Sequence, residues 1–276
     1  MQGSEKNRVY KMMKLSKKTL NKRQQDIINL ARKQDFVTVE HLSEYFKVTQ
    51  QTIRRDLGYL SENLYLARTY GGAFFQSGVS NFNYSARETI AQEDKHKIAK
   101  VVSKIVPDNA SIILNIGTTT EQVAKTLLAS HKGLKIITNN INIVNLASHS
   151  NDCEVWVTGG KVRTGDNAVV GKIASDFISQ FKIDYAIVGV SAIDEDGSLL
   201  DFDHDEVLVS KSIFENCRNL ILVADGIKFD RKAPFLIGNL SQVDIFVTNI
   251  QPSKKILRIC STNNVELIDV NTASNN

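Results

Sequence analysis

Residues 113–124, "ILNIGTTTEQVA", decide the fold of the larger part of this chain. An apolar run ends at Asn115, Gly117 and three threonines follow, and a helical pattern continues through Val123 and Ala124. This order predicts a strand, a tight loop and a helix. The first N–H groups of such a helix converge at the positive end of its dipole, where they bind anions. The loop is therefore a candidate phosphate cradle, either of an enzyme or of a sensor.

The same alternation of strands and helices continues through residues 95–276, which we expect to form one effector-binding domain. It predicts an α/β fold with a mostly parallel sheet and helices on both faces. No G-x-G-x-x-G follows the first strand, so the dinucleotide fingerprint is absent. The predicted strands are Ser111–Leu114, Lys135–Thr138, Glu154–Thr158, Tyr185–Val190, Leu220–Ala224, Asp244–Thr248 and Val265–Asp269.

The loops that follow these strands are rich in Gly, Thr and Asn, and two of them carry a cation that can neutralise a phosphate. Ligands of such sheets bind outside the carboxyl ends of the strands. Together the loops predict a site for a small phosphorylated ligand. The candidate effector-binding residues are Asn115, Gly117, Thr118, Thr119, Thr120, Asn139, Gly160, Arg163, Asp201, Glu206 and Lys228.

An acidic segment, "DEDGSLLDFDHDEV" at residues 194–207, supplies carboxylates that accept hydrogen bonds from the hydroxyls of a polyol. It lacks a His or Cys set beyond His204, so we expect neither a metal site nor a cofactor. Asp201, Glu206 and Lys228 are also groups that an acid–base enzyme would use. This segment alone leaves the enzyme and the sensor open.

The helical stretch "TQQTIRRDLGYL", residues 49–60, has two chemically different faces. Its isoleucine and the two leucines form one narrow apolar stripe, and Gln51, Arg54 and Arg55 fall on the opposite side. Gln and Arg side chains make paired hydrogen bonds to base edges, and further cations fix the register on the phosphates. The stretch therefore predicts a helix that enters the major groove of DNA.

Two more helical patterns precede this helix, at residues 22–34 and 38–48, and Thr38 is a suitable N-cap for the second. Residues 63–73 alternate like a short hairpin. Three short helices and a hairpin make a winged helix-turn-helix, which we place at residues 21–73. The candidate DNA-binding residues are Thr49, Gln50, Gln51, Thr52, Arg54, Arg55 and Arg68.

The distribution of charge supports this division of the chain. Residues 1–72 hold fourteen Lys and Arg against seven Asp and Glu, whereas the remainder holds twenty against twenty-three. Only the first part is therefore expected to meet a polyanion. We expect a basic, disordered tail at residues 1–20 and a linker at residues 74–94, where no steady periodicity is present.

The sequence also indicates a cytoplasmic protein. No apolar stretch is long enough to span a membrane, and no secretory signal follows the basic start. Cys153, Cys217 and Cys260 have no paired spacing, which is typical of reduced thiols rather than of a disulfide framework or a zinc site.

Two motifs, "TQQTIRRDL" and "ARTYGGA", resemble the DNA-binding signature of the DeoR family of bacterial transcriptional regulators, with Tyr70 where the family usually has His. Asp56 is the family's acidic residue after the two arginines, and we expect it to orient an arginine or support the fold. The resemblance extends to about Asn249 through "TNNINIVN", "DFISQFKIDYAIVGVSAIDEDGSLLDFDHDEV" and "ADGIKFDRKA". It implies an effector domain similar in fold to ribose-5-phosphate isomerases and CoA transferases.

The resemblance further implies a repressor of genes for glycerol and glycerol 3-phosphate use, relieved by glycerol 3-phosphate. We expect a homo-oligomer, a dimer or a tetramer, because two recognition helices read a palindromic operator. The family loop usually begins with Asp where this chain has Asn115, which cannot act as a base. This departure favours a sensor over the alternative of a sugar-phosphate isomerase with a DNA-binding appendage. A second alternative is a regulator that answers another sugar phosphate, such as fructose 1-phosphate or deoxyribose 5-phosphate.

Overall fold

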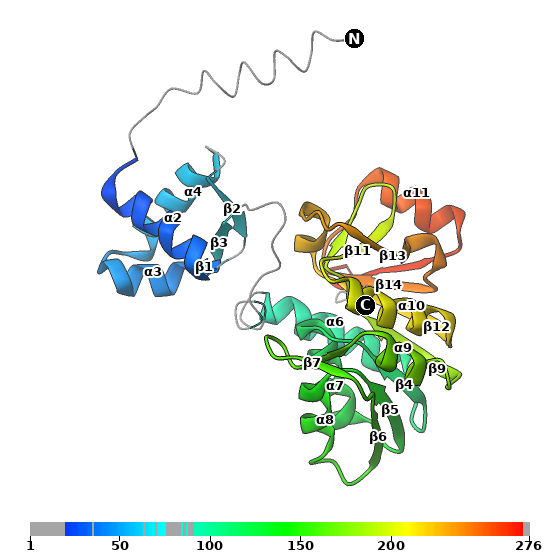
Figure 1. Ribbon diagram of the computed structural model, residues 1–276. Helices are drawn as coiled ribbons and strands as arrows, with labels where there is room; N and C mark the ends of the chain where they lie inside the picture. Colours follow the sequence, from blue (N-terminus) through cyan, green and yellow to red (C-terminus); the bar gives the residue numbers. More distant parts are fainter. Residues whose placement is uncertain are drawn as a thin grey trace. The chain divides into compact units, whose positions relative to one another are not determined.

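A computed structural model describes residues 20–34, 36–62, 65–69, 71–75, 84, 87 and 91–272. The chain divides into two compact units, Met1–Gln76 and Ser77–Asn276 (Figure 1). The predicted tail at residues 1–20 lies outside the described residues except for Leu20. In the part of the chain that is described, no helix has the length and apolar character needed to cross a membrane.

The first unit contains the three predicted helices. They are α2 (Lys22–Gln34), α3 (Val39–Phe46) and α4 (Gln50–Glu62). Thr38 caps α3 as predicted, because its side chain accepts a hydrogen bond from the His41 N–H. The apolar stripe of α4 is fully buried, at Ile53, Leu57 and Leu60, and packs with side chains of α2 and α3 in one core.

The predicted hairpin is formed by β2 (Leu66–Thr69) and β3 (Gly72–Phe75). The turn lies between Thr69 and Gly72, and Asn63 and Tyr70 are outside the described residues. A third strand that the sequence analysis missed, β1 (Phe36–Thr38), pairs with β3 on its other side. A Cβ atom at Gly72 would lie 2.2 Å from the Val37 carbonyl oxygen, so this close strand pair requires glycine.

The second unit is built on a seven-stranded parallel sheet, and each predicted strand is one of its seven strands. Its order is β15-β14-β12-β9-β4-β5-β6, and every neighbouring pair is parallel. From the middle of the sheet, β4, β5 and β6 follow one another toward one edge, and β9, β12, β14 and β15 follow one another toward the other edge. The strands are β4 (Ser111–Leu114), β5 (Leu134–Thr138), β6 (Cys153–Val157), β9 (Ile183–Val188), β12 (Cys217–Ala224), β14 (Ile245–Thr248) and β15 (Glu266–Asp269).

Helices cover both faces of this sheet, and the buried residues form one apolar core on each face (Figure 1). Alternation along β4 shows the two faces, because Ile113 belongs to one core and Ile112 and Leu114 to the other. One core holds α6 (Gln92–Ile105), α7 (Thr118–Ser130) and α8 (Ile141–Ala147). The opposite core holds α9 (Lys172–Ile178), α10 (His204–Glu215) and α11 (Lys254–Thr262).

Short elements at the edge of the sheet were not predicted. Two strands form a hairpin, β7 (Lys161–Arg163) and β8 (Ala168–Val170), and three form a small antiparallel sheet. The latter are β10 (Ala192–Ile193), β11 (Ser198–Asp201) and β13 (Phe235–Asn239), and the 3-10 turns are η1 (Gly226–Asp230) and η2 (Leu240–Gln242).

Candidate functional site

The polar face of α4 is exposed as the sequence predicts. Gln51, Arg54 and Arg55 are exposed on the side opposite the buried stripe, and an Arg54 guanidinium N–H donates to Gln50 Oε1 at 3.1 Å. Thr49, Gln50 and the half-buried Thr52 lie at the start of the same helix. Arg68 lies on β2 opposite Ala73, and its side chain is outside the described part.

Asp56 supports the fold of this unit, as the sequence analysis expected. It is buried on the inner side of α4, where Arg23 Nε donates to Asp56 Oδ2 at 2.6 Å and Gln24 Nε2 donates to Oδ1 at 3.1 Å. Both partners lie on α2, so the carboxylate ties the first helix to the DNA-reading helix. Its negative charge is thereby kept away from the exposed arginines.

The second unit has a cavity at the point where the strand order reverses, between β4 and β9. Parallel α/β sheets bind ligands at this position. Asn115 holds the two strand ends together, because its Nδ2 donates to the Gly189 carbonyl and its Oδ1 accepts from the Gly189 N–H, each at 2.9 Å. The residues that line the cavity come from the loops after β4, β9 and β12, with further residues from α6, α10 and β11.

One wall of the cavity is the N-terminus of α7. Gly117 is the N-cap residue with a φ of 155°, and no side chain caps the helix. The first N–H groups of a helix have no partner within it, and here they belong to Thr118, Thr119 and Thr120, which line the cavity. The Thr120 hydroxyl is used within the loop, donating to the Asn115 and Gly117 carbonyls. This wall is suited to an anion.

Four cationic side chains line the same cavity: Arg87, Lys95, Lys228 and Arg231. The ammonium group of Lys228 makes no hydrogen bond or ion pair with the described residues. Burial and the neighbouring charge of Arg231 lower the pKa of Lys228 to about 7. Burial and the charge of Arg87 likewise lower the pKa of Arg231 to about 10. The cations therefore repel one another until an anion joins them.

Three carboxyl groups, Asp201, Glu206 and Asp225, line the cavity as well. Burial and the negative charge of Asp201 raise the pKa of Glu206 to about 8, against the opposing effect of Arg163. Asp201 Oδ1 accepts from the Phe202 and Asp203 N–H groups, and Asp225 caps η1. These groups can pair with the hydroxyls of a ligand.

Seven of the eleven candidate effector residues line the cavity, and four do not. Asn115 joins the ends of β4 and β9, as described above. Asn139 donates from Nδ2 to the Val169 carbonyl at 3.0 Å. Gly160 lies before β7 and has a φ of 135°. The residues that line the cavity are Gly117, Thr118, Thr119, Thr120, Asp201, Glu206 and Lys228.

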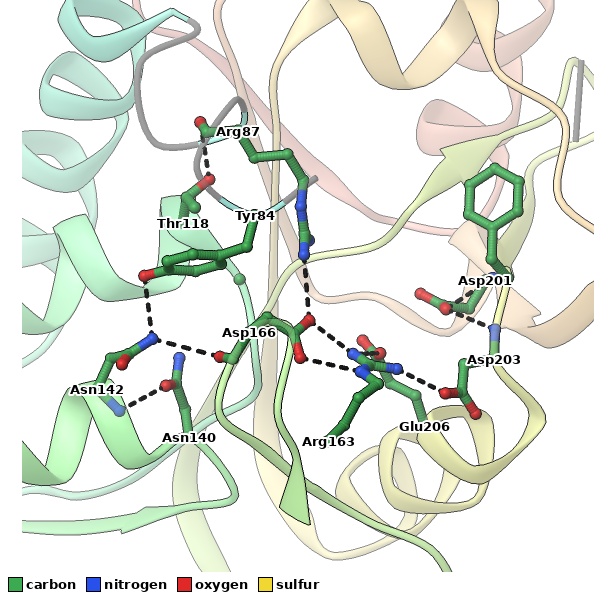
Figure 2. A network of polar contacts seen from close by, with 12 residues as sticks. Tyr84, Arg87, Thr118, Asn140, Asn142, Arg163, Asp166, Asp201, Asp203 and Glu206 are labelled. Carbon is green, nitrogen blue, oxygen red and sulfur yellow. Dashed lines mark hydrogen bonds and ion pairs between the residues drawn. The ribbon is translucent and has the colours of Figure 1, made fainter. Parts of the chain in front are cut away.

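Arg163 is the fourth, and its guanidinium is fully engaged by carboxylates rather than open to a phosphate (Figure 2). It donates twice to Asp166, at 2.9 and 2.8 Å, once to Asp203 at 2.7 Å and once to Glu206 at 2.5 Å. Burial alone would lower its pKa, but Asp166 and Glu206 raise it above the ordinary value. Arg163 also holds the pKa values of Asp166 and Asp203 below their usual range, although burial opposes this.

Ten of the lining positions, from Arg87 to Arg231, were not predicted from the sequence. Three of them follow β9 in "GVSAID" and Asp225 begins "ADGIKF", so the loops were recognised without these residues being chosen. Arg231 lies beyond that loop, and its guanidinium lies 4.9 Å from the centre of the Phe202 ring. The missed residues are Arg87, Lys95, Ile116, Gly189, Val190, Ser191, Val223, Asp225, Ile227 and Arg231.

An exposed Arg/Gln helix on one unit and a cationic cavity at the strand switch of the other define a ligand-responsive, DNA-binding regulator. Comparison with known proteins agrees: residues 23–78 match the DeoR-like helix-turn-helix domain, and residues 90–250 match the DeoR C terminal sensor domain. The chain belongs to the DeoR family, which confirms the resemblance. It is accordingly a transcriptional regulator and not an enzyme.

Individual relatives support this membership. The chain is 39% identical over 245 residues to the glycerol-3-phosphate regulon repressor of Escherichia coli (strain K12), covering 89% of this chain and 97% of that protein. It is 41% identical over 230 residues to the repressor of the same name from Haemophilus influenzae, covering 83% and 89%. Among solved structures, a D-ribose-5-phosphate isomerase in complex with phospho-erythronic acid is 19% identical, with a TM-score of 0.38 over 50% of this chain and 54% of that chain.

Proposed function

We propose that this protein represses genes for glycerol and glycerol 3-phosphate use, and that glycerol 3-phosphate in the cavity of the second unit releases it from DNA. The proposal is supported by relatives named as glycerol-3-phosphate regulon repressors along most of the chain. The observation that carries it is the cavity itself. Lys228, without an ion partner among the described residues, and the α7 N-terminus can hold a phosphate, beside carboxyl groups that can hold hydroxyls.

The ligand is proposed to lie with its phosphate at the Thr118–Thr120 N–H groups and Lys228. Its two hydroxyls then face Asp201 and Asp225. A carboxylate accepts such hydrogen bonds but repels a second phosphate, so the arrangement favours a ligand with one charged end. A regulator that answers another sugar phosphate is the alternative, and it would use the same phosphate contacts.

On the DNA side we propose a cytoplasmic homo-oligomer, a dimer or a tetramer, bound to a palindromic operator. A single recognition helix contacts few base pairs, so helix-turn-helix proteins read two half-sites about one helical turn apart. Thr49, Gln50, Gln51, Thr52, Arg54, Arg55 and Arg68 are the proposed DNA contacts.

Replacing Arg54 by alanine is expected to weaken operator binding by about 1–3 kcal/mol, because a bidentate Arg–guanine contact has about this value. The side chain is exposed and contacts Gln50 of its own helix, so the fold is expected to be unaffected. Fluorescence anisotropy with an operator selected from random duplexes measures the change. The exposed Lys47, outside the helix, is the matched control as Lys47→Ala. Equal operator affinity of wild type and Arg54→Ala would remove this residue from the reading face.

The affinity for glycerol 3-phosphate is expected to fall as the pH rises from 7 to 9. Over this range the unliganded Lys228, whose pKa is about 7, loses its charge and must take up a proton to pair with the phosphate. The phosphate of the ligand is already a dianion there, since its second pKa is near 6. Binding therefore takes up protons, and affinity falls up to about tenfold per pH unit for each proton coupled. Calorimetry in two buffers of different ionisation enthalpy measures this uptake, and an affinity that is constant from pH 7 to 9 would contradict it.

Calorimetric titration of the full chain with glycerol 3-phosphate tests the proposed effector. Glycerol and inorganic phosphate, each alone, are the controls, because each offers one half of the recognised chemistry. Selective binding of glycerol 3-phosphate supports the proposal. Binding of fructose 1-phosphate or deoxyribose 5-phosphate in its place, to the folded protein, would transfer the proposal to that ligand.

A further inference from the structure

We propose that Arg87 is an effector ligand and that, through it, the effector acts on the stretch of chain that joins the two units. This inference rests on the proposed function. Arg87 lies between Gln76, where the first unit ends, and Gln92, where α6 begins. Although it belongs to the expected linker at residues 74–94, its side chain lines the effector cavity. A residue of the connecting stretch is thus part of the sensor site.

The guanidinium of Arg87 has hydrogen-bonding capacity to spare. One of its terminal N–H groups donates to Asp166 Oδ2 at 3.1 Å, whereas its Nε is buried and has no partner among the described residues. A buried N–H donor without a partner is rare, because it has lost its hydrogen bond to water and has gained none within the protein, which costs free energy. In a cavity with an open helix N-terminus, an anionic oxygen of the ligand is the partner that this donor lacks.

Arg87 can break its hydrogen bond to Asp166 without leaving the buried Asp166 carboxylate unpaired. Asp166 also accepts two hydrogen bonds from Arg163, and those remain when Arg87 turns to a ligand (Figure 2). An anion in the cavity competes with Asp166 for the same guanidinium. Effector binding therefore changes how the side chain of Arg87 is held.

The backbone of Arg87 is also held beside the cavity by hydrogen bonds. The Arg87 carbonyl accepts from Lys95 Nζ and from the Thr118 hydroxyl, and Thr118 is the first residue of α7. Tyr84 donates from its hydroxyl to Glu121 Oε2 at 2.5 Å. It also accepts from Asn142 Nδ2 at 3.0 Å (Figure 2). Tyr84 and Arg87 are thus both held by α7, whose N-terminus is proposed to meet the anion, so a ligand that alters these contacts is expected to act on the chain between the two units.

Variants at Arg87 and Tyr84 test this coupling in the full chain. The measured quantity is the factor by which saturating glycerol 3-phosphate weakens operator binding, which in wild type is expected to lie within about 5–150. Arg87→Met should bind the effector more weakly by about tenfold or more and show a coupling factor below about two at saturation. Tyr84→Phe, outside the cavity lining, should bind the effector within about threefold of wild type and still show a reduced factor. Arg258→Met, an exposed arginine of α11, is the matched control.

The outcomes separate this inference from the proposed function. If wild type neither binds glycerol 3-phosphate nor leaves DNA, the proposed function fails and the inference fails with it. If wild type responds and both variants retain the full coupling factor, only the inference is overturned. Arg87→Lys, which keeps the charge and lacks Nε, replaces Arg87→Met if the latter does not fold, and a full coupling factor in this variant and in Tyr84→Phe also overturns it.

Discussion

Arg163→Met is expected to destabilise the second unit by about 3–5 kcal/mol, the usual cost of removing one partner from a buried ion pair. The substitution leaves Asp166, Asp203 and Glu206 around an uncharged side chain, and Asp166 is then held by Arg87 alone. For a domain of this size the thermal midpoint should fall by roughly 6–20 °C. Calorimetry or circular dichroism at pH 7.5 measures this change.

The pH dependence of the unfolding free energy shows whether the lost ion pairs cause the lower stability of Arg163→Met. Without Arg163 the buried carboxyl groups have pKa values above those of the unfolded chain, so the folded variant binds more protons and gains stability as the pH falls toward 5. In the wild type Arg163 holds the pKa of Asp166 low, so the stability that Asp166 contributes is retained down to about pH 5 and is lost only in stronger acid. Arg218→Met is the matched control, because its side chain is 60% exposed and lies 3.7 Å from Asp184; we expect a change within about 0.5 kcal/mol. An Arg163→Met protein as stable as wild type would show that the cluster has no structural role.

Lys228→Met is expected to weaken glycerol 3-phosphate binding by about 2–5 kcal/mol, the range for truncating one partner of a buried charge pair. This corresponds to a loss of about thirtyfold or more. The reason is that the bound phosphate loses the cation that has no other ion partner among the described residues. Operator release by the effector should shift to correspondingly higher concentrations.

The control for this substitution is Lys232→Met. Lys232 is exposed, lies four residues away and does not line the cavity. Calorimetry with glycerol 3-phosphate at pH 7 compares the two variants with wild type. Wild-type affinity in Lys228→Met would place the phosphate elsewhere in the cavity, with Arg87, Lys95 and Arg231 as the remaining cations.

The sequence predicted those parts of the fold that show a regular apolar pattern or that contain residues typical of a helix N-terminus. The seven strands of the large sheet alternate with helical patterns along the chain, and the stripe of Ile53, Leu57 and Leu60 on α4 is regular, so both were recognisable. The loop after β4 was recognisable because Gly117 and the threonines mark a helix N-terminus. Its position at the strand switch then followed from the general placement of ligands in such sheets.

The rest could not be predicted, because it depends on contacts between residues far apart in the chain. Arg163 is a loop cation in the sequence, and only the fold brings Asp203 and Glu206 to it from some forty residues away. Arg87 lies in a stretch with no periodicity, and its side chain reaches Asp166 across seventy-nine residues. The sequence suggested that Asn115 contacts the ligand, but its side chain forms two hydrogen bonds with Gly189, directly after the neighbouring strand β9.

The most direct test of the central claim is operator binding by the full chain, measured by anisotropy at increasing glycerol 3-phosphate, with glycerol and inorganic phosphate in parallel. The operator is selected from random duplexes, and the salt concentration is held constant because DNA affinity depends strongly on it. Glycerol 3-phosphate alone is expected to release the protein, over the concentration range in which calorimetry shows binding. Operator binding that is unchanged at effector concentrations that saturate the protein would contradict it.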